Sequence, residues 1–252
     1  MLNYQGICNA LLSYEKSIAN DYNILQGNLL QDAEKEFLLS EANAFIFGLI
    51  SDQSVKAELA WSLPYKIKQR LGHFDLEKIS DLSSFNELEV YIKTKPALHR
   101  YPKNIAKYLY CASQLICEKY QGNAENIWKD TKSAALVLKR LKEFPGISDK
   151  KAALACLLLS RDLGVVFEDL HNIDIVFDVH IRRIFLRIGL SKNDTLDEIT
   201  NAARLMLPEF PGRLTSSFWA IGRDICRPTN PQCLLCPIEC YCQKNMGVTN
   251  NE

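Results

Sequence analysis

The sequence predicts an all-α protein, and three observations lead to this fold class. Apolar residues recur at the spacing of a helix face in most segments, capping residues precede several of them, and no convincing hairpin of strands occurs. Internal repeats and low-complexity segments are also absent from the sequence. With 252 residues, the chain can bury a substantial core in one or two domains.

The first predicted helices lie between residues 37 and 72. Residues 37–50 are too apolar for a helix with one exposed face, which predicts a core helix. We expect an interruption at residues 51–53 and a second helix over 54–61, ending before Pro64 because proline disrupts a helix interior. A helix over 65–71 should end at Gly72, a typical C-terminal cap.

Capping signals and loop residues divide the middle of the chain. Ser84 and Glu87 form a possible capping box for a short helix. A longer helix follows the break at Pro102, and residues 121–123 should form a loop. Thr131 is expected to cap a helix that runs up to Phe144.

The last third of the chain continues as helix. Residues 152–160 are apolar on every side, so this helix should be buried. Asp178 can cap a helix that ends at Gly189, and Thr195 with Glu198 can open the next one. Residues 213–225 then lead into a group of cysteines.

The stretch from Leu141 to Ala152 predicts a helix, a tight hairpin and a second helix. Pro145 cannot continue the first helix, and Gly146 permits backbone angles that a side chain would forbid. Ser148 or Asp149 can cap the second helix. Unpaired backbone N–H groups at such a helix start bind anions, and a DNA phosphate is one candidate.

Charge and cysteine content restrict the possible surroundings. Thirty basic and thirty acidic residues give zero formal net charge, so any DNA-binding face must be locally basic. No apolar run could span a bilayer, and the N-terminus lacks the blocks of a signal peptide. Nine cysteines fit a cytosolic metal protein better than a secreted disulfide scaffold. We expect a cytoplasmic monomer, nucleoid-associated in a prokaryote, with no membrane partner.

Four cysteines have metal-ligand spacing. Cys226, Cys233, Cys236 and Cys242 follow the pattern Cys-x6-Cys-x2-Cys-x5-Cys, among several prolines. Four thiolates this close can hold one tetrahedral metal ion or an iron–sulfur cluster, and the spacing alone does not separate zinc from iron. Cys240 lies between them and could substitute for a ligand if the register shifts.

The hairpin and the cysteine loop together resemble the endonuclease III-like DNA glycosylases. In that family the turn reads Leu-Pro-Gly-Val-Gly-x-Lys-x-Ala, which residues 144–152 match with Ser148 in place of the second glycine. A Val-Asp-x-His segment follows, matched by residues 177–180. The resemblance implies two helical domains flanking a catalytic cleft, residues 34–170 and residues 1–33 with 171–252. It also implies a [4Fe–4S] cluster on the four cysteines.

Two residues take catalytic roles through this resemblance. The family lysine that matches Lys150 displaces the base from the sugar and forms a Schiff base, and Lys151 is the alternative nucleophile. The matching carboxylate, Asp178, assists the nucleophile and stabilises positive charge on the sugar. Lys150 could otherwise be a solvated helix charge, and Asp178 could simply be a helix cap.

The resemblance also assigns contacts with double-stranded DNA. The hairpin residues Gly146, Ile147 and Ser148 would bind phosphate. Apart from the resemblance, Arg182 and Arg183 are plausible phosphate contacts, although each could be an ordinary solvated charge. Gln53 matches a glutamine that enters the space left by an extruded nucleotide. Residues 99–102 lie where the family places a loop near the cleft, and they could touch DNA or pack at the surface.

The implied function is base-excision repair of DNA containing damaged bases or abasic sites. A bifunctional glycosylase and AP lyase is expected, with oxidised pyrimidines as lesions. A glycosylase for alkylated or mismatched bases and a non-catalytic DNA-binding module are the alternatives. Lys150 and Asp178 are 28 positions apart, more than is usual in the family. The extra residues fall near 167–174, which could shape a lesion pocket or form a surface loop.

Overall fold

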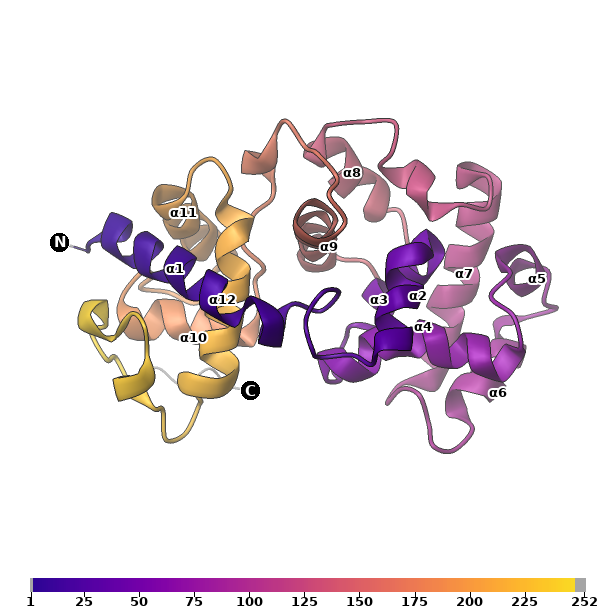
Figure 1. Cartoon of the computed structure of the whole chain (residues 1–252), viewed down its shortest axis with the longest axis horizontal. Coiled ribbons are helices and arrows are strands. Elements are labelled where there is room, and N and C mark those ends of the chain that lie inside the picture. The colour runs from indigo at the N-terminus through magenta and orange to yellow at the C-terminus, as the bar shows by residue number, and fades with distance from the viewer. Residues whose placement is uncertain (1, 248–252) are drawn as a thin grey trace. The chain divides into compact units, whose positions relative to one another are not determined.

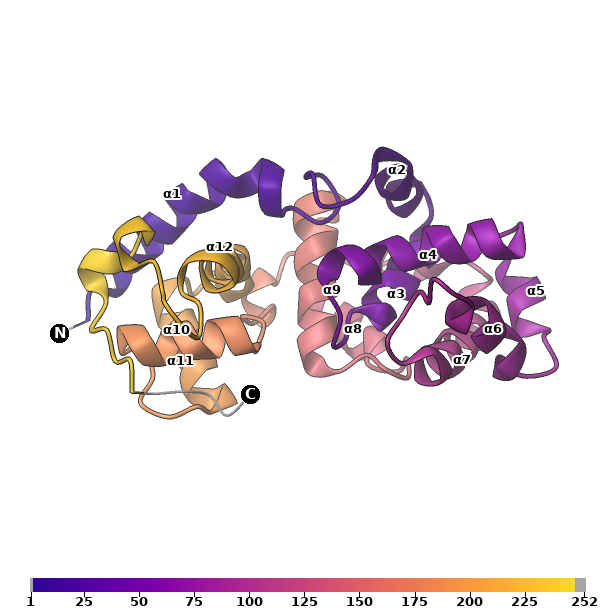
Figure 2. The same cartoon turned by 90° about the horizontal axis from the view of Figure 1, so that it is seen from below.

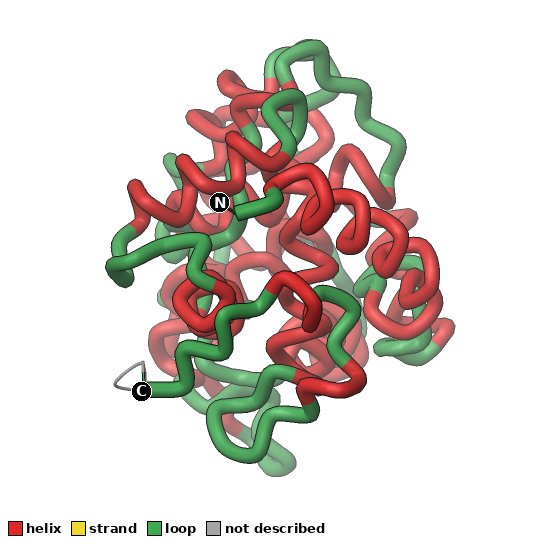
Figure 3. Tube along the Cα trace, turned by 90° about the vertical axis from the view of Figure 1, so that its left-hand side faces the viewer, coloured by secondary structure: helices red, strands yellow, loops and turns green. Residues whose placement is uncertain are grey.

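The computed structural model describes residues 2–247, and this part of the chain contains helices and loops but no strand (Figure 3). The all-α prediction is therefore confirmed. Met1 and residues 248–252, which the predicted second domain included, lie outside the described residues. The α-helices are α1 (Tyr4–Tyr22), α2 (Asp32–Ser40), α3 (Ala42–Ser51), α4 (Ala57–Leu71), α5 (Leu76–Ser80), α6 (Phe85–Lys93), α7 (Pro102–Tyr120), α8 (Ala134–Leu141), α9 (Asp149–Asp162), α10 (Val179–Ile188), α11 (Leu196–Met206) and α12 (Thr215–Ala220).

The chain forms two compact units. Ile24–Glu168 makes one unit, which we call the hairpin unit, and Met1–Asn23 with Asp169–Glu252 makes the other, the cysteine unit (Figure 1). Residues 24–33 and 169–170 therefore lie on the other side of the division from where the sequence analysis had placed them. Each unit is described by itself below.

Helix α3 is the centre of the hairpin unit. Every residue from Asn43 to Ser51 is buried, and α3 contacts α2, α4, α7 and α9 (Figures 1 and 2). Aromatic rings fill the space around it, with the Phe45 ring 5.5 Å from that of Trp61 and 5.9 Å from that of Trp128. Such rings contribute large buried areas, so α3 and its ends are held firmly.

Two predicted helix boundaries among the first helices of this unit are wrong. The apolar run 37–50 is broken at Glu41, whose backbone is extended and whose carboxylate accepts a hydrogen bond from the Asn43 N–H (3.2 Å), starting α3. Helix α4 continues through Pro64, where we expected an end. Pro64 is buried beside Leu63, and core packing outweighs the one backbone hydrogen bond that proline cannot donate.

The predicted caps are correct where a single local residue decides them. Gly72 and Gly189 end α4 and α10 in the left-handed conformation, and Asp178 caps α10. Helix α8, in contrast, starts after Ser133 and not after Thr131, and it ends at Leu141, before Phe144. The Thr131 hydroxyl instead accepts a hydrogen bond from the N–H of the N-cap residue Ser133 (3.1 Å), two residues later.

Glutamates that were expected to complete capping boxes bind neighbouring backbone instead. Ser84 and Thr195 do cap α6 and α11. Glu87, however, accepts from the Ser83 N–H (3.1 Å), and Glu198 accepts from the Lys192 N–H (2.9 Å). The residues that start these helices were therefore predictable, whereas the backbone groups that the two glutamates bind were not.

In the cysteine unit, two buried arginines of α10 hold the backbone that leads into the cysteine loop. Arg183 donates to the carbonyl oxygens of Cys226 and Gly222, both at 2.8 Å. Arg187 donates to the carbonyl oxygens of Arg227 (2.7 Å) and Pro228 (2.8 Å). Hydrogen bonds from a charged group are among the stronger ones, so these contacts fix where the loop begins.

Candidate active site and cysteine loop

The hairpin between α8 and α9 is built as the sequence predicted. Gly146 has a φ of 87°, and a Cβ atom there would lie 2.7 Å from Cδ2 of Tyr108. Glycine is therefore required by both backbone angle and space. Ser148 stands at the N-cap of α9 without a side-chain hydrogen bond, while the exposed Asp149 pairs with Lys142 at 2.8 Å.

The two adjacent lysines of α9 have opposite environments. Lys150 is exposed, whereas Lys151 is only 6% exposed. Neighbouring residues of an α-helix point about 100° apart, so one lysine faces solvent and the other faces α3. The Lys151 Nζ donates to the Ile50 carbonyl oxygen at 2.6 Å. Lys150 is therefore the accessible amine of this pair.

Burial lowers the pKa of Lys151 to about 8, because removal from water disfavours the charged amine. The negative charge of Asp52 acts in the opposite direction, and the positive charge of Lys150 lowers the pKa further. An amine in this environment is partly neutral near physiological pH. Its ammonium form nevertheless has a carbonyl partner within hydrogen-bond distance.

The turn at residues 51–53 lies at the end of α3, next to Lys151. Gln53 is half-buried, and its N–H donates to the Ser51 carbonyl oxygen at 2.8 Å. His99 is 2% exposed, with Nε2 at 3.1 Å from the same carbonyl oxygen. The Trp61 indole N–H donates to the Asp52 carboxylate at 3.2 Å. His99 thus packs inside the hairpin unit. Residues 99–102 were expected either to touch DNA or to pack, and His99 packs.

Asp178 occupies the N-cap of α10 in the cysteine unit. Its Oδ1 accepts from the Ile181 N–H at 2.8 Å, and the residue is half-buried. This carboxylate oxygen satisfies a backbone N–H that the helix itself leaves without a partner. The capping role is therefore confirmed, while a catalytic role stays a prediction.

The arginines after Asp178 are both engaged. Arg182 forms a two-point ion pair with Asp194, with Nε at 2.7 Å from Oδ1, and its guanidinium lies over the Phe177 ring at 4.9 Å. Arg183 is buried against the backbone of the cysteine loop, as described above. Arg182 is therefore the only one of these two arginines with an exposed part, and a phosphate would compete there with Asp194.

All four predicted metal-ligand cysteines line one small cavity of about 20 Å³. The Arg187 guanidinium lies 3.4 Å from the Cys226 sulfur, and the Lys244 N–H donates to the Cys242 sulfur at 3.4 Å. Burial and, to a smaller extent, the other three cysteines together raise the pKa of the Cys236 thiol to about 11, against the lowering effect of a hydrogen bond with the Ile238 backbone. Cys240 is exposed and does not line this cavity.

The donor set around the cavity suits an iron–sulfur cluster. Within residues 2–247, no three His, Cys, Asp or Glu side chains are placed to hold one metal ion. Four cysteines line the one cavity, and N–H donors are directed at two of their sulfurs. Cysteine sulfurs with such hydrogen bonds are the ligands that iron–sulfur clusters take in proteins.

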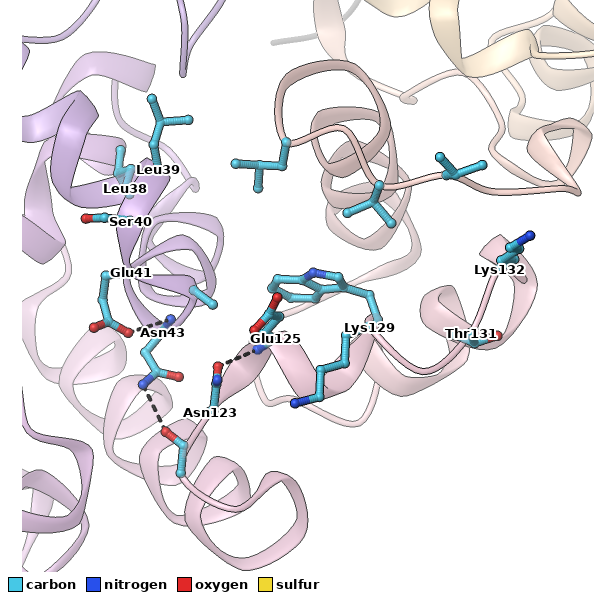
Figure 4. A pocket seen from close by; sticks show the side chains of 16 residues that line it. Leu38, Leu39, Ser40, Glu41, Asn43, Asn123, Glu125, Lys129, Thr131 and Lys132 are labelled. Atoms are coloured by element: carbon cyan, nitrogen blue, oxygen red, sulfur yellow. Dashed lines mark hydrogen bonds between the residues drawn. The ribbon is translucent and has the colours of Figure 1, made fainter.

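A larger pocket of the hairpin unit lies away from these residues. It has a volume of about 780 Å³ and is lined by the end of α2, the start of α3, residues between 122 and 132, and the segment after α9 (Figure 4). Gln53 follows the other end of α3, and Lys150 lies at the other end of α9. Its polar groups also bind one another, as Asn43 donates to the Gly122 carbonyl oxygen at 3.0 Å. This pocket therefore contains none of the predicted site residues.

The segment before Asp178 is tied down at both ends. Glu168 pairs with Lys132 at 3.0 Å within the hairpin unit. In the cysteine unit, Asp174 pairs with Arg204 at 2.8 Å, and the buried Ile173 accepts from the Gly212 N–H at 2.8 Å. These contacts favour a structural role for the segment over a lesion pocket.

Lys151 and His99 converge on the end of α3, which was not predicted from the sequence. A signal was present for the lysine, since Lys151 shares a helix face with the buried Ala155 and Leu159. His99 lies in a loop, and only the tertiary structure brings it to Ser51.

No described helix is long and apolar enough to cross a membrane.

No family model matches the chain. The chain is 30% identical to endonuclease III of Rickettsia conorii over 170 residues, 66% of this chain and 68% of that protein. It is 28% identical to endonuclease III of Thermotoga maritima over 132 residues, 52% of this chain and 53% of that protein.

Solved structures share the fold over nearly the whole chain. A non-covalent endonuclease III–DNA complex superimposes with a TM-score of 0.68 at 17% identity, covering 97% of both chains. A thermostable thymine-DNA glycosylase superimposes with a TM-score of 0.66 at 13% identity, also covering 97% of both chains.

Proposed function

The chain belongs to the endonuclease III family of helix-hairpin-helix DNA glycosylases, and from this premise we propose that it is a base-excision repair glycosylase with AP-lyase activity. Its substrates are duplexes with damaged bases, oxidised pyrimidines in the first place, or with abasic sites. The observation that carries this proposal is the exposed amine of Lys150 at the first turn of the hairpin helix α9. A protein that only grips DNA phosphates needs no nucleophile at this position.

In the proposed reaction, the neutral Lys150 amine attacks the sugar C1′. The glycosidic bond breaks, the base leaves with the bonding electrons and is protonated, and the sugar ring opens to a protonated imine. Loss of a C2′ proton then expels the 3′ phosphate by β-elimination, which cuts the strand. Asp178, held in place by its hydrogen bond from the Ile181 N–H, stabilises the positive charge that develops on the sugar.

We further propose that the hairpin holds a DNA phosphate. Gly146 lets the backbone turn closely there, Ile147 and Ser148 complete the turn, and the Ser148 hydroxyl does not block the first N–H groups of α9. Gln53 fills the space left by the extruded nucleotide. Arg182 adds a phosphate contact when it leaves Asp194.

Affinity for undamaged duplex should fall steeply as salt rises, in spite of the zero net charge. Each phosphate contact releases bound counterions, so an interface with about three contacts should show a slope near −3 in log K against log salt. Fluorescence anisotropy between 50 and 300 mM potassium chloride measures this slope. Salt-independent affinity would contradict a phosphate-binding hairpin. Gly146 is a poor probe for this test, because a side chain there would strike Tyr108.

The cysteine loop is proposed to hold a [4Fe–4S] cluster. Cys226, Cys233, Cys236 and Cys242 would be its ligands, and the residues around the cavity fit such a group. When bound, the cluster supplies structural support to the loop. Arg187 and the Lys244 N–H would donate to the ligand sulfurs and stabilise their negative charge.

Strand cleavage at an abasic site tests the proposed function. Under single-turnover conditions, the protein should cut an abasic duplex without heat or alkali and leave a β-elimination product. A panel of duplexes with oxidised, alkylated or mismatched bases then identifies the preferred lesion. Base release without cleavage would identify a monofunctional glycosylase of the same scaffold. Binding without either reaction would identify a DNA-binding module.

A further inference from the structure

The last carbonyl groups of α3 receive side-chain donors from two other segments. An α-helix leaves its last four carbonyl oxygens without intrahelical partners. Here the Ile50 carbonyl accepts from Lys151 of α9 (2.6 Å), and the Ser51 carbonyl is 3.1 Å from His99 Nε2, just before α7. No glycine cap follows α3, since the chain continues into Asp52 with a φ of −76°. The two side chains replace the cap.

We propose that Lys151 and His99 are positioning residues that hold the Ser51–Gln53 turn in the shape that presents Gln53 to DNA. The inference rests on the proposed function, in which Gln53 fills the gap left by an extruded nucleotide. Neither residue touches the reacting atoms. They act through the backbone to which Gln53 is attached.

The tautomer of His99 follows from its two contacts. Its Nδ1 accepts from the Tyr101 N–H at 3.0 Å, so Nε2 carries the proton and donates to the Ser51 carbonyl oxygen. Burial lowers the pKa of His99, hydrogen bonds with the Ser51 and Gln53 backbone act in the opposite direction, and the positive charge of Lys151 lowers the pKa. The two hydrogen bonds fix the orientation of the imidazole next to the turn.

Lys151 connects the turn to the hairpin. It lies one residue after Lys150 and three after the N-cap Ser148, so its backbone moves with the start of α9. Its side chain ends on the last turn of α3. The groups that face it are the Ile50 carbonyl, Asp52, His99 and the adjacent Lys150. If the hairpin moves when DNA binds, the Lys151 side chain would therefore move the end of α3, to which Gln53 is attached.

The burial of a lysine at this position is costly, which supports a specific role. Desolvation of an ammonium group destabilises the folded state unless strong partners compensate. The other buried residues of α9 are mostly alanine and leucine, and either would pack here without that cost. What an apolar residue cannot do is donate to the Ile50 carbonyl oxygen.

The test uses 2-aminopurine placed opposite a tetrahydrofuran abasic analogue, a duplex that binds without reacting. Insertion of Gln53 should unstack the orphaned 2-aminopurine and raise its fluorescence. We expect this rise with the full wild-type chain and its loss with Gln53→Ala. Lys151→Met and His99→Phe should each reduce the rise, whereas His99→Gln, which keeps a donor at the place of Nε2, should restore it.

The same variants are assayed on two reactive substrates. Cleavage of an abasic duplex should slow about tenfold in Lys151→Met, as expected for one lost charge-assisted hydrogen bond. Borohydride trapping on a single-stranded abasic oligonucleotide, which requires no gap filling, should be unchanged. Lys78→Met, the same charge change on exposed α5, should behave as wild type throughout.

The outcomes separate the two hypotheses. Wild-type fluorescence and duplex rates in both Lys151→Met and His99→Phe would overturn the positioning role. The fluorescence test uses a duplex that does not react. It therefore still decides the role of Lys151 if the wild-type protein does not cleave abasic sites and the lyase proposal fails. A melting scan of each variant confirms that it is folded, and His99→Gln against His99→Phe decides the question if Lys151→Met does not fold.

Discussion

Replacing Lys150 by glutamine should abolish the covalent adduct that borohydride traps between the protein and abasic DNA. The amine of Lys150 is the exposed member of the lysine pair, and glutamine cannot form an imine. We expect a loss of roughly a thousandfold or more, the order seen when a covalent nucleophile is removed. Duplex affinity should change by no more than about threefold, because one exposed charge contributes little to phosphate binding. Gel electrophoresis of the trapped complex measures the loss.

Lys142→Gln is the matched control for this variant. Lys142 is exposed on the same hairpin and pairs with Asp149, so the substitution removes an equal charge without removing the proposed nucleophile. It should trap DNA at the wild-type rate. Trapping by Lys150→Gln at that rate would exclude Lys150 as the nucleophile, and Lys151 would be the first alternative.

Replacing Cys236 by alanine should remove the iron–sulfur cluster and destabilise the cysteine unit. The Cys236 side chain lines the cavity with the other three proposed ligands, and a cluster binding free energy is part of the folding free energy. The visible absorption of the purified protein should disappear. We expect the melting temperature to fall by about 5–10 °C, which corresponds to roughly 2–3 kcal/mol in a chain of this size.

Cys240→Ala provides the comparison, because Cys240 is exposed and lies outside the cavity. This variant should keep its colour, its iron content and its melting temperature. Equal effects of the two substitutions would indicate that the register of the ligands is different from the one proposed. One zinc and no iron in the wild-type protein would exclude the cluster but not the fold.

Local chemistry explains which parts of the fold could be predicted from the sequence. Gly72, Gly146 and Gly189 adopt left-handed backbone that other residues rarely take, and Asp178 caps its helix through its own side chain. These features depend on one or two neighbouring residues. The sequence therefore locates the hairpin and several helix ends correctly.

Features that depend on distant contacts could not be predicted. Pro64, for example, stays inside α4 because the core buries it. The opposite environments of Lys150 and Lys151 follow from the way α9 packs against α3. The family motif predicts that Lys150 reacts. It does not predict that the neighbouring Lys151 donates a hydrogen bond to the end of α3.

The residue that carries the trapped sugar can be identified directly by mass spectrometry. After borohydride treatment of the wild-type protein with abasic DNA, nuclease and protease digestion leaves a sugar remnant on one peptide. We predict that fragmentation places this remnant on the Nζ of Lys150. A remnant on Lys151, or on any residue outside the hairpin, would contradict the assignment of Lys150 as the nucleophile.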